Sequence, residues 1–422
     1  RVTTWFGLKY AAAPVGDLRF AAPRAVEQSG TYSRGQMVDA TSQGVICVHG
    51  FPGWRLTNTT VLPIGKEDCL LLDVQAPANP KSSKLPVMVQ IHGGGYAQGN
   101  SEFYPGYALV NASEGNMIYV TMQYRLSAYG FLGGAEVKRH GAANAGLLDQ
   151  RLALEWIQRH ISAFGGDPDQ VTIIGGSAGG SSVSLHLTMY GGVQNPPFRA
   201  AIAEYPWWQS LHDDDIVEIQ YRDLLDAAGC TNITCLRGLS EDDLAQAQEN
   251  SLTAGYAAGH YGWGDFYYGP YVDGVIIQDL PSNDFKRGHF SKASRTQEQV
   301  PLMTNHDGYE GFNYRDKNIS TMQDVVTGFE SLFPTATPSF FKRLFELYPA
   351  SNYNSSFFQS AGIFGDYIID CPTYYMATAA SDYVPVWKMI FDAGTQLHGA
   401  DKDFLFNTSF GGMCLLPLWL CP

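Results

Sequence analysis

The sequence has no long hydrophobic run, no excess of basic residues and few cysteines. No apolar stretch approaches the length of a membrane span, so we expect no integral membrane segment. The net charge is −14 and the acidic residues are scattered, whereas a nucleic-acid surface would need a basic patch. Seven cysteines in 422 residues are too few for a scaffold held by disulfides. These absences leave a globular protein without a nucleic-acid partner.

Internal repeats, low-complexity tracts and Ser/Gly-rich linkers are also missing. Without a linker, residues 1–422 are expected to form a single domain with long functional loops. At 422 residues, of which 45% are hydrophobic, such a domain has an ample core to bury.

Buried-strand patterns alternate with helical patterns along the chain. Strands are expected at residues 70–77, 85–91, 116–126, 171–174, 200–208 and 384–394, and helices at residues 145–166, 181–189 and 338–348. Such an alternation predicts a mostly parallel sheet covered by helices on both faces, with functional sites at the carboxyl ends of the strands. The predicted fold class is therefore α/β.

The stretch VTIIGGSAGGSSVSLHL places one serine among glycines, between a strand pattern and a helix pattern. Its pentad fits G-x-S-x-G, but with 45 glycines in the chain about 0.3 matches are expected by chance, so the context must decide. Strand, sharp turn and helix are the context of a nucleophile elbow. Gly175 and Gly179 would relieve crowding in the turn, and the start of the helix would direct N–H groups toward developing negative charge. The alternative is a glycine turn in which Ser177 is a bystander.

A second glycine cluster, IHGGGY, follows the strand expected at residues 85–91. Glycines suit a loop that turns two backbone N–H groups toward one point, because side chains would obstruct the approach. The amides of Gly94 and Gly95, together with the amide of Ala178, are predicted to stabilise an oxyanion. The alternative is a simple glycine turn.

A serine nucleophile needs a base, and the base needs an orienting acid. The best placed of the ten histidines is His398, which follows the strand expected at residues 384–394. The stretch PLMTNHDGYEGF, after another plausible strand end, offers Glu310 and Asp307 as the acid. We favour Glu310, because the following glycine leaves its carboxylate on a turn that can reach inward. The order serine, acid, histidine is the one expected for an α/β-hydrolase.

Cysteines and sequons together favour an oxidising, secretory environment. Two cysteine pairs are plausible, since Cys230 and Cys235 lie close together and Cys47 and Cys69 bracket an irregular stretch. N-x-S/T sequons without an intervening proline occur at Asn58, Asn111, Asn232, Asn318, Asn354 and Asn407. We therefore expect a secreted glycoprotein whose signal peptide would have been removed.

Seven motifs occur in a fixed order over residues 6–410: YAAAPVGDLRF, EDCLLLDV, IHGGGY, QYRLSAYGFL, NAGLLDQRLALEWIQRHISAFGGDP, VTIIGGSAGG and LHGADKDF. In this order they resemble the motifs of the type-B carboxylesterase/lipase family, which includes cholinesterases and fungal secreted lipases. The chain is most similar to the fungal extracellular esterases of that family. The resemblance implies an α/β-hydrolase fold and favours Ser177 as a nucleophile over the bystander interpretation.

The resemblance also implies two disulfides and two structural ion pairs. They are Cys47 with Cys69, Cys230 with Cys235, Arg19 with Glu67, and Arg125 with Asp167. Three cysteines, Cys371, Cys414 and Cys421, have no assigned partner.

Substrate-binding positions follow from the same resemblance. The loop closed by Cys47 and Cys69 corresponds to the lid, or gorge wall, of the family, and it carries Phe51 and Trp54. The glycine-rich loop adds Tyr96 as a further residue expected to bind substrate. Trp207 and Trp208 follow the strand after the elbow, where the family builds its acyl pocket. Two indoles there would favour flat or short acyl groups, whereas the alternative is that both are ordinary core aromatics.

Three features depart from the family pattern. Residue 176 is Gly where cholinesterases carry Glu, which argues against a quaternary-ammonium substrate. The acid lies in Asp-Gly-Tyr-Glu-Gly, where family members commonly show Asp-Glu-Gly. The family's first hairpin is missing before Arg1, and only a short tail follows His398, as expected of a truncated or misannotated reading frame or of a natural minimal variant.

The function implied by the resemblance is hydrolysis of carboxylic esters through an acyl-enzyme. Ser177 would attack the carbonyl, His398 would take and then donate the proton, and Glu310 would hold the imidazole. No metal or cofactor is expected, and His306 beside Asp307 lacks metal-ligand spacing. Two alternatives stay open: an acyl transferase or lactone-forming enzyme, in which an alcohol replaces water, and a non-catalytic binding module. The sequence does not indicate the oligomeric state.

Overall fold

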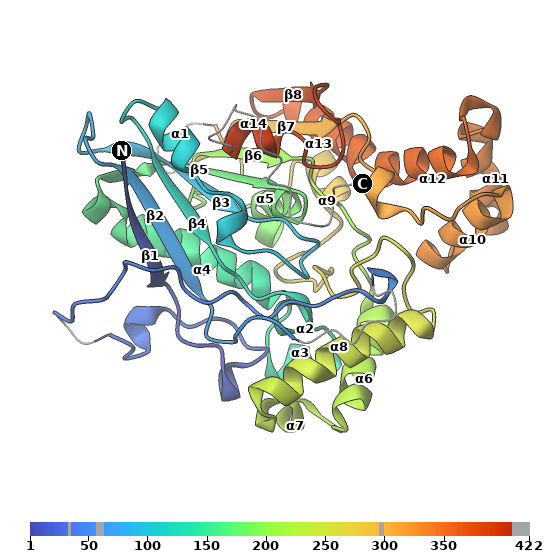
Figure 1. The fold of residues 1–422 in the computed structure, drawn as a ribbon, viewed down its shortest axis with the longest axis horizontal. Coiled ribbons are helices and arrows are strands. Elements are labelled where there is room, and N and C mark those ends of the chain that lie inside the picture. Colours follow the sequence, from blue (N-terminus) through green and yellow to red (C-terminus); the bar gives the residue numbers. More distant parts are fainter. Residues whose placement is uncertain (33–34, 56–62, 295–298, 407–422) are drawn as a thin grey trace.

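An eight-stranded sheet forms the centre of the computed structural model, which describes residues 1–32, 35–55, 63–294 and 299–406 (Figure 1). Its strands are β1 (Val2–Lys9), β2 (Leu71–Pro77), β3 (Leu85–Ile91), β4 (Ile118–Met122), β5 (Gly166–Gly176), β6 (Ala200–Glu204), β7 (Leu302–Asp307) and β8 (Val386–Phe391). Their order is β1-β2-β4-β3-β5-β6-β7-β8, in which β2 runs antiparallel to β1 and β4 and all other neighbours are parallel. The predicted α/β class with a mostly parallel sheet is confirmed.

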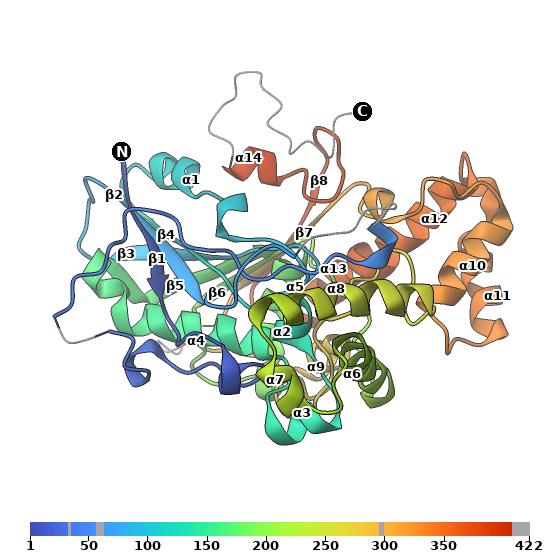
Figure 2. The same cartoon turned by 60° about the horizontal axis from the view of Figure 1, so that its bottom comes forward.

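Helices cover both faces of this sheet (Figure 2). They are α1 (Tyr107–Ala112), α2 (Ser127–Phe131), α3 (Ala135–His140), α4 (Ala145–His160), α5 (Ala178–Thr188), α6 (Asp214–Ala228), α7 (Ile233–Gly238), α8 (Glu241–Ala257), α9 (Pro281–Arg287), α10 (Met322–Leu332), α11 (Pro338–Leu347), α12 (Ser356–Gly365), α13 (Cys371–Ser381) and α14 (Lys402–Phe406). α1 and α14 contact each other on one face, whereas α4 and α5 contact β5 on the other. In the described part of the chain, no helix is both long and apolar enough to span a bilayer.

The predicted elements are present, with shifts at their ends. α4 ends at His160, and a short 3-10 turn then leads to Gly165, whose φ of 87° ends the helical path. β6 ends at Glu204 instead of continuing over the predicted residues 200–208, because the chain turns at Tyr205, where φ is 31°. The sequence of β1 does not alternate clearly between apolar and polar residues. Most of its residues are half-buried, because β1 lies at the antiparallel edge of the sheet.

Two groups of helices interrupt the alternation of strand and helix. α6, α7 and α8 come between β6 and β7 in the chain, whereas α10, α11 and α12 form a lobe at the end of the molecule opposite β1 (Figure 1). The side chains of Asp213, Ser240 and Thr321 cap α6, α8 and α10 by accepting hydrogen bonds from backbone N–H groups of the first turns. Both groups follow strands of the parallel part of the sheet, so they enlarge the region around the carboxyl ends of those strands.

The central strand β5 positions the functional site. Its side chains Val171 and Ile173 are fully buried, as expected for a strand between two parallel neighbours, β3 and β6. Because β3, β5, β6, β7 and β8 run in one direction, their carboxyl ends meet at one edge of the sheet. The glycine-rich loop and the residues Ser177, Glu204 and Asp307 all lie at or just beyond these ends.

Both disulfides implied by the resemblance are present. They join Cys47 to Cys69 and Cys230 to Cys235. Cys371 is a free, exposed thiol among the described residues, whereas Cys414 and Cys421 lie outside them.

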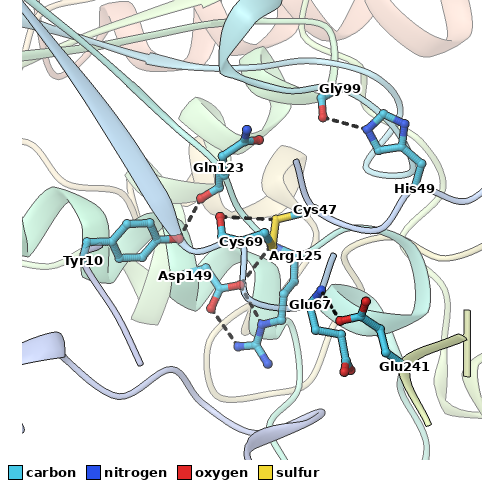
Figure 3. The surroundings of a disulfide bond; sticks show 10 residues. All are labelled: Tyr10, Cys47, His49, Glu67, Cys69, Gly99, Gln123, Arg125, Asp149 and Glu241. Carbon is cyan, nitrogen blue, oxygen red and sulfur yellow. Dashed lines mark hydrogen bonds and ion pairs between the residues drawn. A yellow bond between two sulfur atoms is a disulfide. The ribbon is translucent and has the colours of Figure 1, made fainter. Parts of the chain in front are cut away.

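One of the two implied ion pairs is confirmed and the other is wrong. Arg19 donates to both carboxylate oxygens of Glu67 at 2.7 Å, and both side chains are buried. Arg125 pairs with Asp149 of α4, at 2.8 and 2.7 Å, and not with Asp167 (Figure 3). The reason is burial: Asp149 is fully enclosed and also accepts the Arg125 amide, whereas Asp167 lies half-exposed at the start of β5.

We predict that Asp149→Asn lowers the free energy of unfolding by about 3–5 kcal/mol, because it leaves the buried Arg125 guanidinium without a counter-charge. Asp167→Asn is the matched control and should change it by less than about 1 kcal/mol, as expected for a partly exposed side chain. Denaturant unfolding followed by tryptophan fluorescence measures both. Equal losses for the two variants would contradict the assigned pairing.

Candidate active site

The turn between β5 and α5 holds Ser177 in a strained conformation. Its φ is 59° and its ψ is −125°, a combination that L-residues rarely adopt. A Cβ atom on Gly175 would lie 2.5 Å from backbone atoms of Gly179, and one on Gly179 would lie 2.1 Å from the Ile91 oxygen. Both glycines are therefore required by close backbone approach, as the sequence predicts. The Ser177 amide donates to the backbone carbonyl oxygen of Glu204 at 3.1 Å, which ties the turn to β6.

The loop after β3 lies directly against this turn. A Cβ atom on Gly93 would lie 3.0 Å from the Ser177 Cβ. Gly94 and Gly95 have φ values of 113° and 65°, which favour glycine. Neither their amides nor the amide of Ala178 donates a hydrogen bond to another described residue. The structure thus leaves three N–H donors beside Ser177 free for a ligand.

His398 and Glu310 form a hydrogen-bonded pair at the same edge of the sheet. His398 Nδ1 lies 2.5 Å from Glu310 Oε2, and both side chains are buried. A backbone hydrogen bond joins the loops that carry them, because the Tyr309 amide donates to the backbone carbonyl oxygen of Gln396 at 2.8 Å. Among the described residues His398 Nε2 has no partner, so this nitrogen is free to accept a proton.

Asp307, the other candidate acid, does not bind the imidazole. Its Oδ2 accepts the Gly399 and Ala400 amides at 2.7 and 3.3 Å, and its own amide donates to Glu310 Oε1 at 2.6 Å. The carboxylate therefore anchors the backbone just after His398. Of the two acids left open by the sequence, the structure brings Glu310 to the histidine.

Burial sets the protonation of these groups. It lowers the pKa of His398 to about 4, which leaves the imidazole neutral at neutral pH, and it raises the pKa of Glu310. Burial, followed by the negative charges of Glu310 and Asp401, raises the pKa of Asp307 to about 7. It also raises the pKa of Asp401 to about 6 and the pKa of Glu204, and the charges of Asp401 and Asp307 add to the rise at Glu204.

Aromatic side chains connect Ser177 with His398. The Trp207 amide donates to the backbone carbonyl oxygen of Ser177 at 3.0 Å, while the Trp207 ring centroid lies 5.7 Å from that of His398. The Tyr205 ring lies 5.0 Å from the imidazole, and its hydroxyl oxygen lies 2.2 Å from where a Cβ of Gly176 would be. The serine and the histidine therefore share one aromatic shell, although no hydrogen bond joins them in the described residues.

Trp207 and Trp54 belong to one aromatic wall. Phe266 contacts both indoles, with its ring centroid 5.7 Å from that of Trp207 and 5.8 Å from that of Trp54. A Cβ on Gly95 would lie 2.4 Å from the Phe266 ring, so the wall also touches the glycine-rich loop. Phe51, from the same loop as Trp54, is half-buried, and its amide donates to the Glu249 carboxylate.

Two residues expected to bind substrate have other contacts. Tyr96 is fully buried, and its hydroxyl accepts a hydrogen bond from Ser182, so its contacts are those of a core residue. Trp208 donates from Nε1 to Ser184 Oγ at 3.0 Å and stacks on Phe285. Trp208 also lines a cavity of about 240 Å³ against α5, and it does not touch the His398 ring.

Several residues of this site carry no sequence motif. Phe266 and Tyr314 lie in loops of the helical insertions, and Tyr314 approaches His398 with a ring separation of 5.2 Å. The aromatic run around Phe266 was the only signal available for them. Asp401 lies three positions after His398 in the LHGADKDF motif and accepts a hydrogen bond from Asn305, which no spacing rule indicates.

We predict that Asp307→Asn becomes more stable relative to the wild type as the pH rises from about 4 to about 7. An unfolded Asp has a pKa of about 3.9, so in this interval the folded protein holds a proton that the unfolded chain has lost, and wild-type stability falls with pH. Asn mimics the protonated acid and retains an acceptor for the Gly399 amide.

Denaturant unfolding at each pH measures this difference. Asp169→Asn removes the same charge from an exposed position and gives the effect of net charge alone. A stability difference between Asp307→Asn and the wild type that did not change with pH would contradict the raised pKa.

Comparison with known proteins agrees with this geometry. The model of the carboxylesterase family matches residues 1–414. The secreted triacylglycerol lipase LIP1 of Gibberella zeae is 31% identical, with 95% of this chain and 74% of the relative covered. Secreted lipase 1 of Botryotinia fuckeliana is 33% identical, with 96% and 77% covered. The crystal structure of Aspergillus niger EstA matches with a TM-score of 0.81 at 30% identity, covering 96% of this chain and 78% of that one. The protein belongs to the carboxylesterase family, has its α/β-hydrolase fold and is a carboxylic ester hydrolase.

Proposed function

We propose that the protein hydrolyses carboxylic esters through an acyl-enzyme on Ser177. The observation that carries the proposal is the buried His398–Glu310 pair beside the strained serine turn. His398 Nε2 takes the proton of the serine hydroxyl as the oxygen attacks the carbonyl, and then gives it to the leaving alcohol. Water repeats the sequence and releases the acid. Glu310 keeps Nδ1 protonated and stabilises the imidazolium that forms.

The oxyanion of each tetrahedral intermediate is bound by the amides of Gly94, Gly95 and Ala178. Their freedom from other hydrogen bonds supports this role, because donors already directed at the site need no reorganisation during the reaction. The Ala178 amide also lies at the first position of α5, where the helix dipole favours negative charge.

The neutral form of His398 suits the role of base. Burial disfavours the imidazolium and lowers the pKa of His398, so the unprotonated nitrogen is available at neutral pH. The carboxylate of Glu310, which lies 2.5 Å from Nδ1, offsets part of that cost once the proton arrives.

We also infer that the protein is secreted and glycosylated, and that residues 1–422 belong to one domain. Two disulfides and the similarity to two lipases named as secreted support secretion. The side chains of Asn111, Asn232, Asn318 and Asn354 are exposed, as glycan acceptors must be. Asn58 and Asn407 lie outside the described residues. Expression in a secreting host tests this proposal. The protein should appear in the medium, and treatment with a glycosidase should increase its electrophoretic mobility.

Trp207 is the residue that limits acyl size. Its ring lies between His398 and Phe266, whereas Trp208 faces Ser184 and Phe285. Substrate-binding roles for Tyr96 and Trp54 rest on the family resemblance and on the place of Trp54 in the aromatic wall.

We predict that Ser177→Ala lowers kcat for 4-nitrophenyl butyrate by a factor of at least about 10⁴, and that Glu310→Gln lowers it by about 10³ to 10⁴. Asp307→Asn should cost less than about tenfold, since Asn can still accept the Gly399 amide. Initial rates of nitrophenolate release measure all three. A fluorophosphonate label should bind wild-type protein and not Ser177→Ala.

Turnover by Ser177→Ala equal to that of the wild type would exclude the serine mechanism. A folded wild type with no turnover and no label would instead favour a non-catalytic binding module. Product analysis with an added alcohol separates hydrolysis from acyl transfer.

We predict that Trp207→Phe shifts the preferred acyl chain of 4-nitrophenyl esters from short to longer chains, with a several-fold rise in the octanoate-to-butyrate ratio of kcat/KM. The smaller ring opens space beside His398. Trp208→Phe is the matched control and should leave the ratio near that of the wild type. A larger change in Trp208→Phe would show that the cavity under α5 holds the acyl chain.

A further inference from the structure

Arg55 is a cation at the aromatic wall. Its guanidinium carbon lies 4.9 Å from the Trp54 ring centroid and 5.2 Å from that of Phe266. Nη1 donates to Gln98 Oε1 at 3.2 Å, in the turn that follows the glycine-rich loop. Within the described residues no carboxylate lies within ion-pair distance of Arg55, and residues 56–62 contain no Asp or Glu.

Two aromatic rings and the surrounding protein partly enclose this guanidinium. The Arg55 side chain is exposed to solvent, yet enough protein surrounds it for burial to lower its pKa. Stacking on two rings fixes the plane of the guanidinium and removes part of its hydration. Among the described contacts Nε and Nη2 remain without acceptors, and such a pair of donors can bind a carboxylate in bidentate geometry.

The wall under Arg55 leads to the reacting groups. The Phe266 ring contacts the Arg55 guanidinium, and it also contacts Gly95 and the Trp207 ring. Tyr314 lies between the two regions, because its ring contacts His398 and the charges of both Arg55 and Glu310 act on its hydroxyl. An ester bound at Ser177 would therefore extend along this wall toward the guanidinium.

A local cation has a clear use in a protein of this charge. The net charge of the chain is −14. An anionic substrate would be repelled by this field unless a positive group received its charge.

We propose that Arg55 forms a subsite for a carboxylate on the substrate, so that the protein prefers esters bearing a carboxylate in the acyl or the alcohol half. The inference rests on the proposed ester hydrolysis at Ser177 and names the substrate class of that site. The ester bond is cleaved as described above, and the distal carboxylate only binds.

Two matched substrate pairs test the proposal. The acyl-side pair is 4-nitrophenyl hydrogen suberate and its terminal carboxamide, and the alcohol-side pair is 4-acetoxybenzoate and 4-acetoxybenzamide. In each pair the carboxamide keeps the shape and removes the charge, so the ratio of the two kcat/KM values isolates recognition of the carboxylate.

We predict a ratio above one for at least one pair in the wild type, and a fall of about tenfold in Arg55→Gln, the loss expected for a hydrogen bond to a charged group. Arg55→Lys keeps the charge without the planar fork and should retain part of the preference. Arg343→Gln removes the same charge from the exposed face of α11 and should leave the ratio unchanged. Added salt should lower the wild-type ratio.

The pair that shows the preference identifies the half of the ester that reaches Arg55. No carboxylate preference in either pair, or an unchanged ratio in Arg55→Gln, would overturn the subsite while leaving ester hydrolysis intact. If neither neutral ester is cleaved faster than by Ser177→Ala, the proposed function itself fails, and the subsite fails with it.

Discussion

The strained turn at Ser177 is the constraint on which the rest of the site depends. Its positive φ is held because α5 lies so close to β5 and to the end of β3 that only glycine fits at positions 175 and 179. Two backbone hydrogen bonds then hold the turn against β6 and the residues after it. The Ser177 amide donates to the Glu204 carbonyl oxygen, and the Trp207 amide donates to the Ser177 carbonyl oxygen. Since these are backbone contacts, the position of the serine is a property of the sheet and does not rely on side-chain packing.

A second constraint is the concentration of buried acids behind the histidine. Burying several carboxyls together is costly, and the cost appears as raised pKa values for Glu204, Asp307 and Asp401. In return, Asp307 holds the backbone after His398, and Glu310 holds the ring. The aromatic shell keeps water from these groups, which strengthens each hydrogen bond and orients the imidazole without help from solvent.

The pattern of strands, the elbow and the glycine-rich loop could be predicted because each depends on residues adjacent in the chain. Acid assignment was harder, since two carboxyls three positions apart are equivalent until the loop around His398 is placed. The partner of Arg125 could not be derived either. Asp149 lies in the first half of α4 and Asp167 at the start of β5, and only the first is fully buried beside Arg125. Trp208 follows Trp207 directly, but the turn after β6 sends the two indoles in different directions.

The sequence by itself determined the order of most strands and helices and the glycines that the serine turn requires, and it singled out the residues proposed as nucleophile and base. These are local properties, set by hydrophobic periodicity and by backbone conformation. Tertiary structure alone decided which acid meets His398, which aromatic rings enclose it and where Arg55 lies. The reason is that Phe266, Tyr314 and Arg55 come from loops far apart in the chain, and their meeting depends on how those loops pack over the carboxyl edge of the sheet.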